Sequence, residues 1–144
     1  MSNTRIAIVY HSGYGHTARQ AQAVKAGVEQ VKGVEALFLT VEEAPTRWDD
    51  LAAAEAIIFG APTYMAGPSA PFKVFQEASS HAVLAKNAGW KNKISAGFTN
   101  SGSQSGDKLA TLIQIALFAA STACTGSIST YRRRTTPRPD RRET

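Results

Sequence analysis

Four short apolar segments recur along the first hundred residues, each rich in β-branched or aromatic side chains. Runs of this length, bounded by glycine, proline or polar residues, predict buried strands. The segment AIIFGAP is apolar throughout and includes Gly60 and Pro62 at its end. An uninterrupted apolar run is typical of a strand that is buried on both faces of a parallel sheet. The predicted strands cover residues 5–10, 34–40, 56–62 and 93–99.

Helical spacing of apolar residues follows each predicted strand. After the first strand, Ala21, Val24, Val28 and Val31 recur at intervals of three and four residues, and Gly33 marks the predicted helix end. Four strands alternating with four helices predict one α/β domain, an open parallel sheet covered by helices on both faces. The other predicted helices cover residues 47–55, 69–79 and 107–120, the last of them strongly apolar.

The loop after the first predicted strand reads HSGYGHT, residues 11–17, and leads directly into a helix. Unpaired N–H groups and the helix dipole attract an anion to a helix amino-terminus. Two glycines let the backbone turn its amides inward, and the hydroxyls add donors. The loop is not a G-x-G-x-x-G fingerprint, because Ala18 stands at the third glycine position, and it lacks G-K-[ST]. It predicts an anion site; the alternative is a plain connecting turn capped by Thr17.

Two further loops leave the carboxyl ends of predicted strands, where open parallel sheets bind ligands. In GAPTYMAGPSAPF, residues 60–72, Tyr64 and Met65 offer flat or polarizable surface to a planar ring. In TNSGSQSGDK, residues 99–108, amides and hydroxyls suit a sugar chain or a heteroaromatic edge. The alternatives are an ordinary loop that covers the core and a disordered linker.

The remaining polar side chains suggest no metal site and no acid–base machinery. His11 and His16 are five residues apart without a third partner, which argues against zinc. We expect His81 at the surface and Trp90 in the core. No Ser–His–Asp, Cys–His or paired-carboxylate arrangement stands out, so an enzyme built this way would leave the chemistry to a cofactor.

Cysteine usage and hydropathy indicate a cytoplasmic protein. The single cysteine, Cys124, can form no internal disulfide. No apolar run approaches the ~20 residues of a membrane span. The start MSNTRIAIVY lacks the features of a secretory signal.

The net charge of +5 belongs to the last 24 residues. Without them, ten of the 16 basic and nine of the 11 acidic residues remain, so the predicted domain is nearly neutral. This distribution argues against nucleic acid as the partner of the domain. The tail contains Asp140, Glu143 and six arginines, at positions 132, 133, 134, 138, 141 and 142.

Taken together, the segments YHSGYGHT, IIFGAPTYMAGPSAPFKVFQE and FTNSGSQSGDK resemble the three FMN-binding loops of flavodoxin-like NAD(P)H:quinone oxidoreductases. This family is also called tryptophan-repressor-binding flavoproteins or NADPH-dependent FMN reductases. The resemblance covers residues 5–120. It implies ping-pong hydride transfer from NAD(P)H through flavin N5 to a quinone, by a homo-oligomer, dimeric or tetrameric, with no catalytic side chain and no metal.

The resemblance also implies which residues bind FMN. The phosphate would be held by Ser12, Gly13, Tyr14, Gly15, His16 and Thr17. The isoalloxazine would be lined by Pro62, Thr63, Tyr64 and Met65. The ring edge and ribityl chain would meet Thr99, Asn100, Ser101, Gly102, Ser103, Gln104, Ser105 and Gly106.

The segment 121–144 departs from the family, in which a His-Gly turn, a fifth strand and a last helix are expected. Residues 121–129 can be encoded by codons whose bases, when one extra C precedes them, are read in the shifted frame as QHGMHWVNL. That sequence would supply a turn and an apolar strand. We therefore interpret the tail as a disordered frame-shift product, which would weaken stability, FMN binding, oligomerisation and activity. A natural divergent tail or a basic interaction arm are the alternatives, and resequencing the DNA at Ala120 separates them.

Two other functions fit the sequence. A flavodoxin-type electron carrier would bind FMN without turning over a substrate, although carriers are typically acidic around the flavin and this domain is neutral. The other alternative is a protein without catalytic activity, either a truncated flavin-binding product or a binding module that uses its arginine-rich tail. The sequence does not indicate a choice between NADH and NADPH, or which quinone is reduced.

Overall fold

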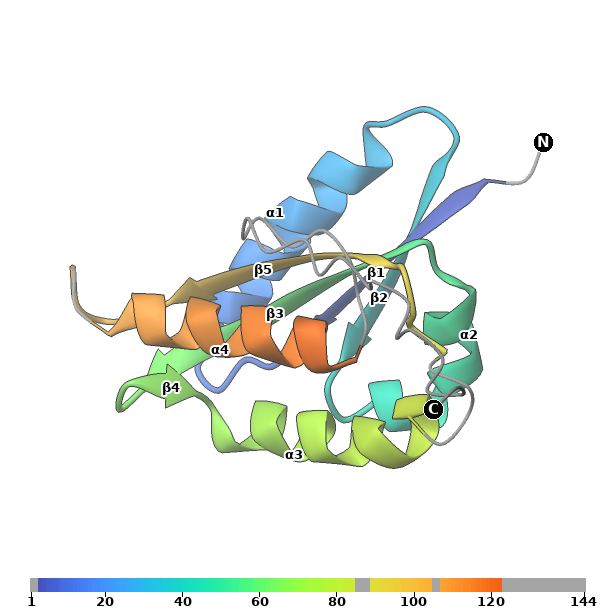
Figure 1. The fold of residues 1–144 in the computed structure, drawn as a ribbon. Coiled ribbons are helices and arrows are strands. Elements are labelled where there is room, and N and C mark those ends of the chain that lie inside the picture. Colours follow the sequence, from blue (N-terminus) through green and yellow to red (C-terminus); the bar gives the residue numbers. More distant parts are fainter. Residues whose placement is uncertain (1–2, 85–88, 105–106, 123–144) are drawn as a thin grey trace, which may run out of the picture.

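The computed structural model describes residues 3–84, 89–104 and 107–122. Within them, strands and helices alternate in the predicted order (Figure 1). The strands are β1 Thr4–Tyr10, β2 Val34–Thr40, β3 Ala56–Tyr64, β4 Gly67–Pro68 and β5 Ile94–Asn100. The α-helices are α1 His16–Glu29, α2 Trp48–Ala53, α3 Ala70–Ser79 and α4 Lys108–Ser121.

The four long strands form one parallel sheet in the order β2-β1-β3-β5. β1 pairs with β2 on one side and with β3 on the other, so the strand order reverses between β1 and β3. In open α/β sheets, ligands bind outside the carboxyl ends of the strands at such a switch point. The sheet therefore places the loops after β1, β3 and β5 at one edge.

Helices cover both faces of the sheet, as predicted. α1 lies on one face, whereas α3 and α4 lie on the other (Figure 1). Alternation along β5 agrees with this arrangement. Gly97 faces Ile115 of α4, and Asn100, three residues on, bonds Gln20 of α1.

The core between the sheet and α3 and α4 is rich in aromatic rings. Phe59 of β3 has ring-centroid distances of 5.3 Å to Phe118 and 6.0 Å to Trp90. Trp90 is 1% exposed, so its predicted packing role is confirmed. Burying several large rings in one cluster supplies much of the hydrophobic stabilisation of a domain of this size.

The structure differs from the predicted elements at several boundaries. α1 ends at Glu29, and Val31 lies beyond it with 57% exposure, so Val31 does not belong to the buried helix face. β3 runs on to Tyr64, past the predicted end at Pro62. A 3₁₀ turn (44–46), the short β4 and a π-helical turn (80–84) were not predicted. The predicted frame-shift segment falls almost wholly on residues 123–144, outside the described part of the chain.

Ser95 is a point of predicted instability. Its side chain is 1% exposed, and its hydroxyl has no hydrogen-bond partner among the described residues. Burying an unpaired hydroxyl costs about 1–3 kcal/mol. Ser95→Ala is therefore expected to raise the free energy of unfolding by about 1 kcal/mol in denaturant titrations. An unchanged or lower stability would contradict this account of the site.

Tyr10, the last residue of β1, is expected to make the stability of the fold decrease at alkaline pH. Burial raises the pKa of Tyr10, and the nearby Glu43 and Glu42 raise this pKa further. The folded state thus keeps a proton that the unfolded state releases at lower pH. The contribution of Tyr10 to the free energy of unfolding is therefore fully present below its unfolded pKa of about 10. It is lost as the pH rises above that value.

The matched variant is Tyr10→Phe, which keeps the ring packed at 4.9 Å from Phe38. Wild-type stability is expected to fall more steeply above about pH 10 than that of the variant. The difference is read from denaturant titrations across the alkaline range. Parallel pH curves for the two chains would show that Tyr10 does not titrate abnormally.

Candidate functional site

A cleft of about 560 Å³ opens at the carboxyl ends of the strands. Clefts of this size typically bind small molecules and cofactors. All three loops singled out in the sequence contribute to it, together with the first turns of α1. The lining residues are Tyr14, His16, Thr17, Gln20, Pro62, Tyr64, Asn100, Ser101 and Gly102.

The first loop presents backbone amides at the start of α1. Gly15 takes a left-handed conformation with φ of 91°, which glycine adopts without strain. Its N–H donates to Ser12 Oγ at 3.1 Å, which holds the loop closed. Among the described residues, no side chain caps the helix, and its first turn, beginning at His16, contains no acid. The amino-terminal end of α1, which carries the positive end of the helix dipole, therefore borders the cleft through His16 and Thr17, an arrangement that favours an anion.

Thr17 and Gln20 connect this helix to the third loop. Asn100 Nδ2 donates to Thr17 Oγ1 at 3.0 Å and to Gln20 Oε1 at 2.9 Å. Gln20 Nε2 in turn donates to the Thr99 carbonyl at 3.3 Å. Gln20 was not among the predicted site residues. Its spacing of one helical turn from Thr17 would have placed it on the same face.

The second loop supplies a flat wall from Pro62 and Tyr64. The Tyr64 ring meets Tyr14 edge-on, with centroids 6.1 Å apart and planes at 73°. Its hydroxyl lies over the first loop, where a Cβ on Gly13 would come within 2.5 Å of it. The absence of a side chain at Gly13 is what allows Tyr64 to approach. Met65 is 97% exposed and does not line the cleft.

Thr63 directs its side chain away from the cleft. Its hydroxyl bonds Thr99 Oγ1 at 2.7 Å and donates to Thr111 Oγ1 at 2.8 Å, on the α4 side of the sheet. Any contact of Thr63 with a bound ring would therefore come from its backbone. The threonine cluster instead ties the ends of β3 and β5 to α4.

Ser101 and Gly102 of the third loop line the cleft, and Lys108 holds the loop in place. Lys108 Nζ donates to Ser101 Oγ at 2.9 Å and to the Ser103 carbonyl at 2.5 Å. Ser103 and Gln104 are exposed and lie outside the lining of the cleft. The predicted contacts of residues 105 and 106 fall outside the described residues.

The histidines take separate places. His11 Nδ1 bonds Ser69 Oγ at 2.7 Å, His16 lines the cleft, and His81 is exposed on the π-helical turn. Within the described ranges, no three His, Cys, Asp or Glu side chains come together as a metal site would need.

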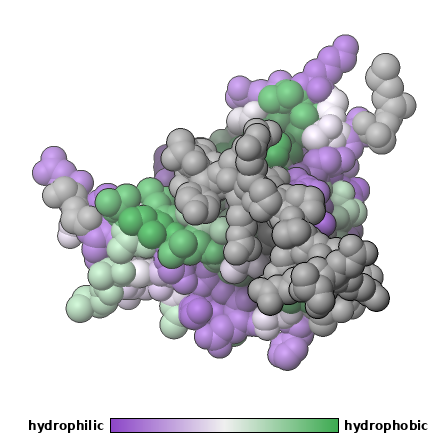
Figure 2. Space-filling view, in the orientation of Figure 1, coloured by the Kyte–Doolittle hydropathy of each residue, from purple (hydrophilic) through white to green (hydrophobic). Residues whose placement is uncertain are grey.

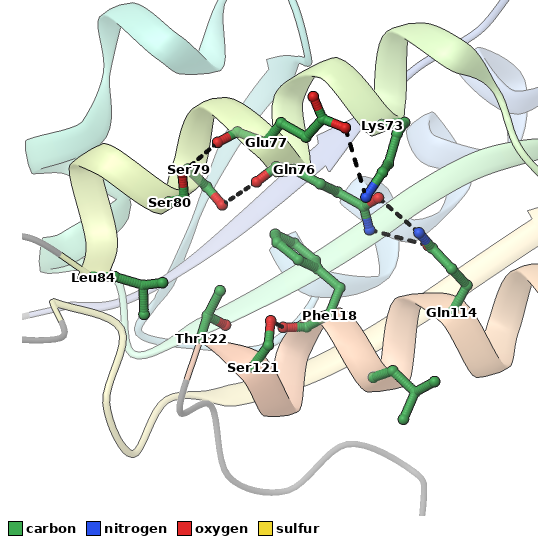
Figure 3. Close-up of a pocket in the computed structure, with 11 residues that line it drawn as sticks. Lys73, Gln76, Glu77, Ser79, Ser80, Leu84, Gln114, Phe118, Ser121 and Thr122 are labelled. Carbon is green, nitrogen blue, oxygen red and sulfur yellow. Dashed lines mark hydrogen bonds and ion pairs between the residues drawn. The ribbon is translucent and has the colours of Figure 1, made fainter.

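A second cavity, of about 390 Å³, lies between α3 and the carboxyl end of α4 (Figure 3). Gln76 and Gln114 exchange two amide hydrogen bonds there, at 3.0 and 2.9 Å. The hydroxyls of Ser79 and Ser121 donate to backbone carbonyls three residues earlier. These amide and hydroxyl groups are already hydrogen-bonded, as several in the cleft are. This cavity, however, lies at the carboxyl end of α4, where the helix dipole disfavours an anion.

The fold and the cleft define a class of protein, the flavodoxin-like flavoproteins. The family model for NADPH-dependent FMN reductase matches residues 14–128. The chain belongs to this family. Among the described residues, each helix is too short or too polar to span a bilayer.

Solved and curated relatives agree with the assignment. A crystal structure of a WrbA-like flavodoxin from Agrobacterium tumefaciens is 44% identical, with a TM-score of 0.74 over 85% of this chain and 75% of that one. Flavodoxin FldP from Pseudomonas aeruginosa is 39% identical over 76% of this chain and 58% of its own length. The NAD(P)H dehydrogenase (quinone) from Geobacter metallireducens is 32% identical over 79% and 66%. The chain thus spans about three fifths to two thirds of these curated relatives.

Proposed function

We propose that the chain is an FMN-dependent NAD(P)H:quinone oxidoreductase. The observation that carries the proposal is the convergence of three loops on one cleft, each with chemistry suited to a different part of FMN. The quinone dehydrogenase from Geobacter metallireducens adds support from sequence similarity. NAD(P)H and a quinone are the proposed substrates, and the cytoplasm is the proposed location.

The chemistry of the residues that line the cleft supports FMN as the ligand. The phosphate would lie at the amides that begin α1, near His16, where neither the first turn of the helix nor the described lining of the cleft contains a carboxylate. Pro62 and Tyr64 would provide the apolar wall that a planar ring needs. Asn100 and Ser101 would meet its polar edge and ribityl chain. The predicted contacts of Thr63, Met65, Ser103 and Gln104 remain predictions.

Bound flavin would supply the redox chemistry, taking a hydride from NAD(P)H and delivering two electrons to a quinone. The protein's part is to bind and orient. The first loop would anchor the phosphate and the Tyr64 wall would restrict the ring. The bonds from Asn100 to Thr17 and Gln20 hold the third loop against α1. Such positioning turns a bimolecular transfer into an effectively intramolecular one.

Steady-state oxidation of NADPH with benzoquinone, with and without added FMN, tests the proposal. The proposed function predicts saturable, FMN-dependent turnover with ping-pong kinetics. Flavin binding without turnover would instead favour a flavodoxin-type electron carrier. That second candidate has its own support in the 39% identity to flavodoxin FldP. A chain that binds flavin neither tightly nor productively would match the third reading, an inactive truncated product.

We further propose that the chain self-associates through α4. Leu109 and Leu117, each 65% exposed, lie on this helix with the half-exposed Ile113. In Figure 2 a hydrophobic patch lies over α4. Large contiguous apolar patches mark interaction surfaces or aggregation liabilities.

Leu117→Lys is therefore expected to lower the apparent mass in sedimentation experiments, because it places a charge in the proposed interface. Val74→Lys is the matched control, since Val74 is 66% exposed but lies on α3. Equal masses for both variants and the wild type would contradict an α4 interface.

The boundary at residue 120 and the frame-shift origin of the tail also remain proposals. The family match continues to residue 128, eight residues beyond Ala120. Resequencing the gene around this codon decides the matter. An uninterrupted frame in an independent isolate would overturn the frame-shift proposal.

A further inference from the structure

The turn between β3 and β4 has an unusual backbone for its sequence. Tyr64 pairs with Gly67 across a two-residue turn, in which Met65 has φ of 48° and Ala66 of 66°. Positive φ at both central residues is the pattern of type I′ hairpins, which favour Asn-Gly. Residues with a Cβ adopt this left-handed conformation only at a cost. Interactions outside the turn must therefore help to hold it.

Asp107 provides such an interaction. The Ala66 N–H donates to Asp107 Oδ2 at 2.9 Å. Asp107 stands at the N-cap of α4, where an aspartate commonly accepts from its own helix. In the described structure its side chain makes no such capping bond. The Asp107 carboxylate instead accepts a hydrogen bond from the hairpin.

Neighbouring residues of the same helical turn hold the other parts of the cleft. Lys108 donates to Ser101 Oγ at 2.9 Å, which fixes the third loop. Thr111 accepts from Thr63 at 2.8 Å, which fixes the end of β3. The start of α4 thus joins the Tyr64 wall to the loop that faces it.

We infer that Asp107 is a positioning residue: through Ala66 it sets where Tyr64 stands relative to Ser101, and hence the width of the ring-binding part of the cleft. Its effect on a flavin rests on the proposed function. Its effect on the hairpin does not, so the two can be tested separately.

The first experiment uses the flavin-free chain and measures amide hydrogen exchange at Ala66 by NMR. Asp107→Ala is expected to speed exchange at Ala66 by roughly tenfold or more, because the acceptor is lost. Asp107→Asn keeps an acceptor oxygen and should largely retain protection. Asp49→Ala is the control, since Asp49 is an exposed acid in the first turn of α2. Unchanged exchange in Asp107→Ala overturns the inference, whether or not the wild type binds FMN.

The second experiment adds FMN and reads the circular dichroism of the visible flavin bands together with the dissociation constant. Asp107→Ala is expected to alter the flavin spectrum and to weaken binding roughly tenfold. If the wild-type chain does not bind FMN, the proposed function is wrong. The role of Asp107 in the hairpin is then decided by the amide-exchange experiment alone.

A rescue variant separates positioning from a loss of helix capping. In the Asp107→Ala chain, Met65→Asn with Ala66→Gly supplies the residues that type I′ turns favour. These changes should restore the flavin spectrum and most of the affinity if Asp107 acts through the hairpin. They cannot repair a defect in α4, so an absence of rescue contradicts the inference. Should Asp107→Ala fail to fold, the same two turn substitutions are made in the Asp107→Asn chain. There they should slow amide exchange in the hairpin, and unchanged exchange at Tyr64 would contradict the inference.

Discussion

His16→Glu is expected to weaken FMN binding by about 100-fold. His16 begins α1 and lines the cleft beside the proposed phosphate site. A phosphate monoester carries about −1.5 to −2 charges at neutral pH. A second anion at about 4 Å costs roughly 1 kcal/mol in water and about 4 kcal/mol near a protein surface, for each unit of charge. A loss of about 3 kcal/mol lies within this range and corresponds to about two orders of magnitude.

The same substitution should leave the fold intact, because an acidic residue near a helix amino-terminus stabilises it by about 0.3–1 kcal/mol. Riboflavin, which lacks the phosphate, should bind the variant and the wild type alike. His81→Glu is the matched control at an exposed histidine away from the cleft. Equal FMN affinity in His16→Glu and wild type would place the phosphate elsewhere.

Gly60→Ala is expected to lower the free energy of unfolding by about 3 kcal/mol, which lowers Tm by about 10 °C. Gly60 of β3 pairs with Phe98 of β5, and the Phe98 ring lies across it. A Cβ at Gly60 would come within 2.1 Å of Phe98 Cζ. Overpacking of this kind forces a ring off its rotamer or moves a strand. The strand in question leads directly to Pro62 of the cleft.

Two further variants make the result interpretable. Gly27→Ala lies inside α1 with nothing within 4 Å of the added Cβ, and should stabilise the chain by about 0.5–1 kcal/mol. Adding Phe98→Ala to Gly60→Ala should cost less than the sum of the single changes, because the clash is gone. Additive losses in thermal melts would show that the ring does not confine Gly60.

Much of the fold could be predicted because two of its strands are apolar on both faces and strands alternate with helices along the chain. The strand 56–62 and the helix 69–79 differ from β3 and α3 by no more than two residues at either end. The error at Val31 has a simple cause: the apolar spacing continues past the point where the backbone leaves the helix. Periodicity reports which side chains suit a helix face, whereas the helix end depends on the turn that follows.

The cleft was predictable as three loops but not as a set of contacts. Thr63 was assigned to a loop, yet β3 continues through it, and strand alternation then turns its hydroxyl to the opposite face from Pro62 and Tyr64. Gln20 and Asp107 were missed because their partners lie 79 and 41 residues away in the chain. Helical spacing could have placed Gln20 on the same face as Thr17, but no local pattern shows which distant residue a side chain bonds.

The most direct test of the account is a titration of the purified chain into FMN, followed by quenching of flavin fluorescence, with riboflavin in parallel. We expect saturable quenching at one FMN per chain and clearly weaker binding of riboflavin, because the amides at the start of α1 are proposed to hold the phosphate. Equal affinity for the two flavins would contradict the phosphate site. No quenching of FMN by a folded chain would contradict the cleft as a flavin site altogether.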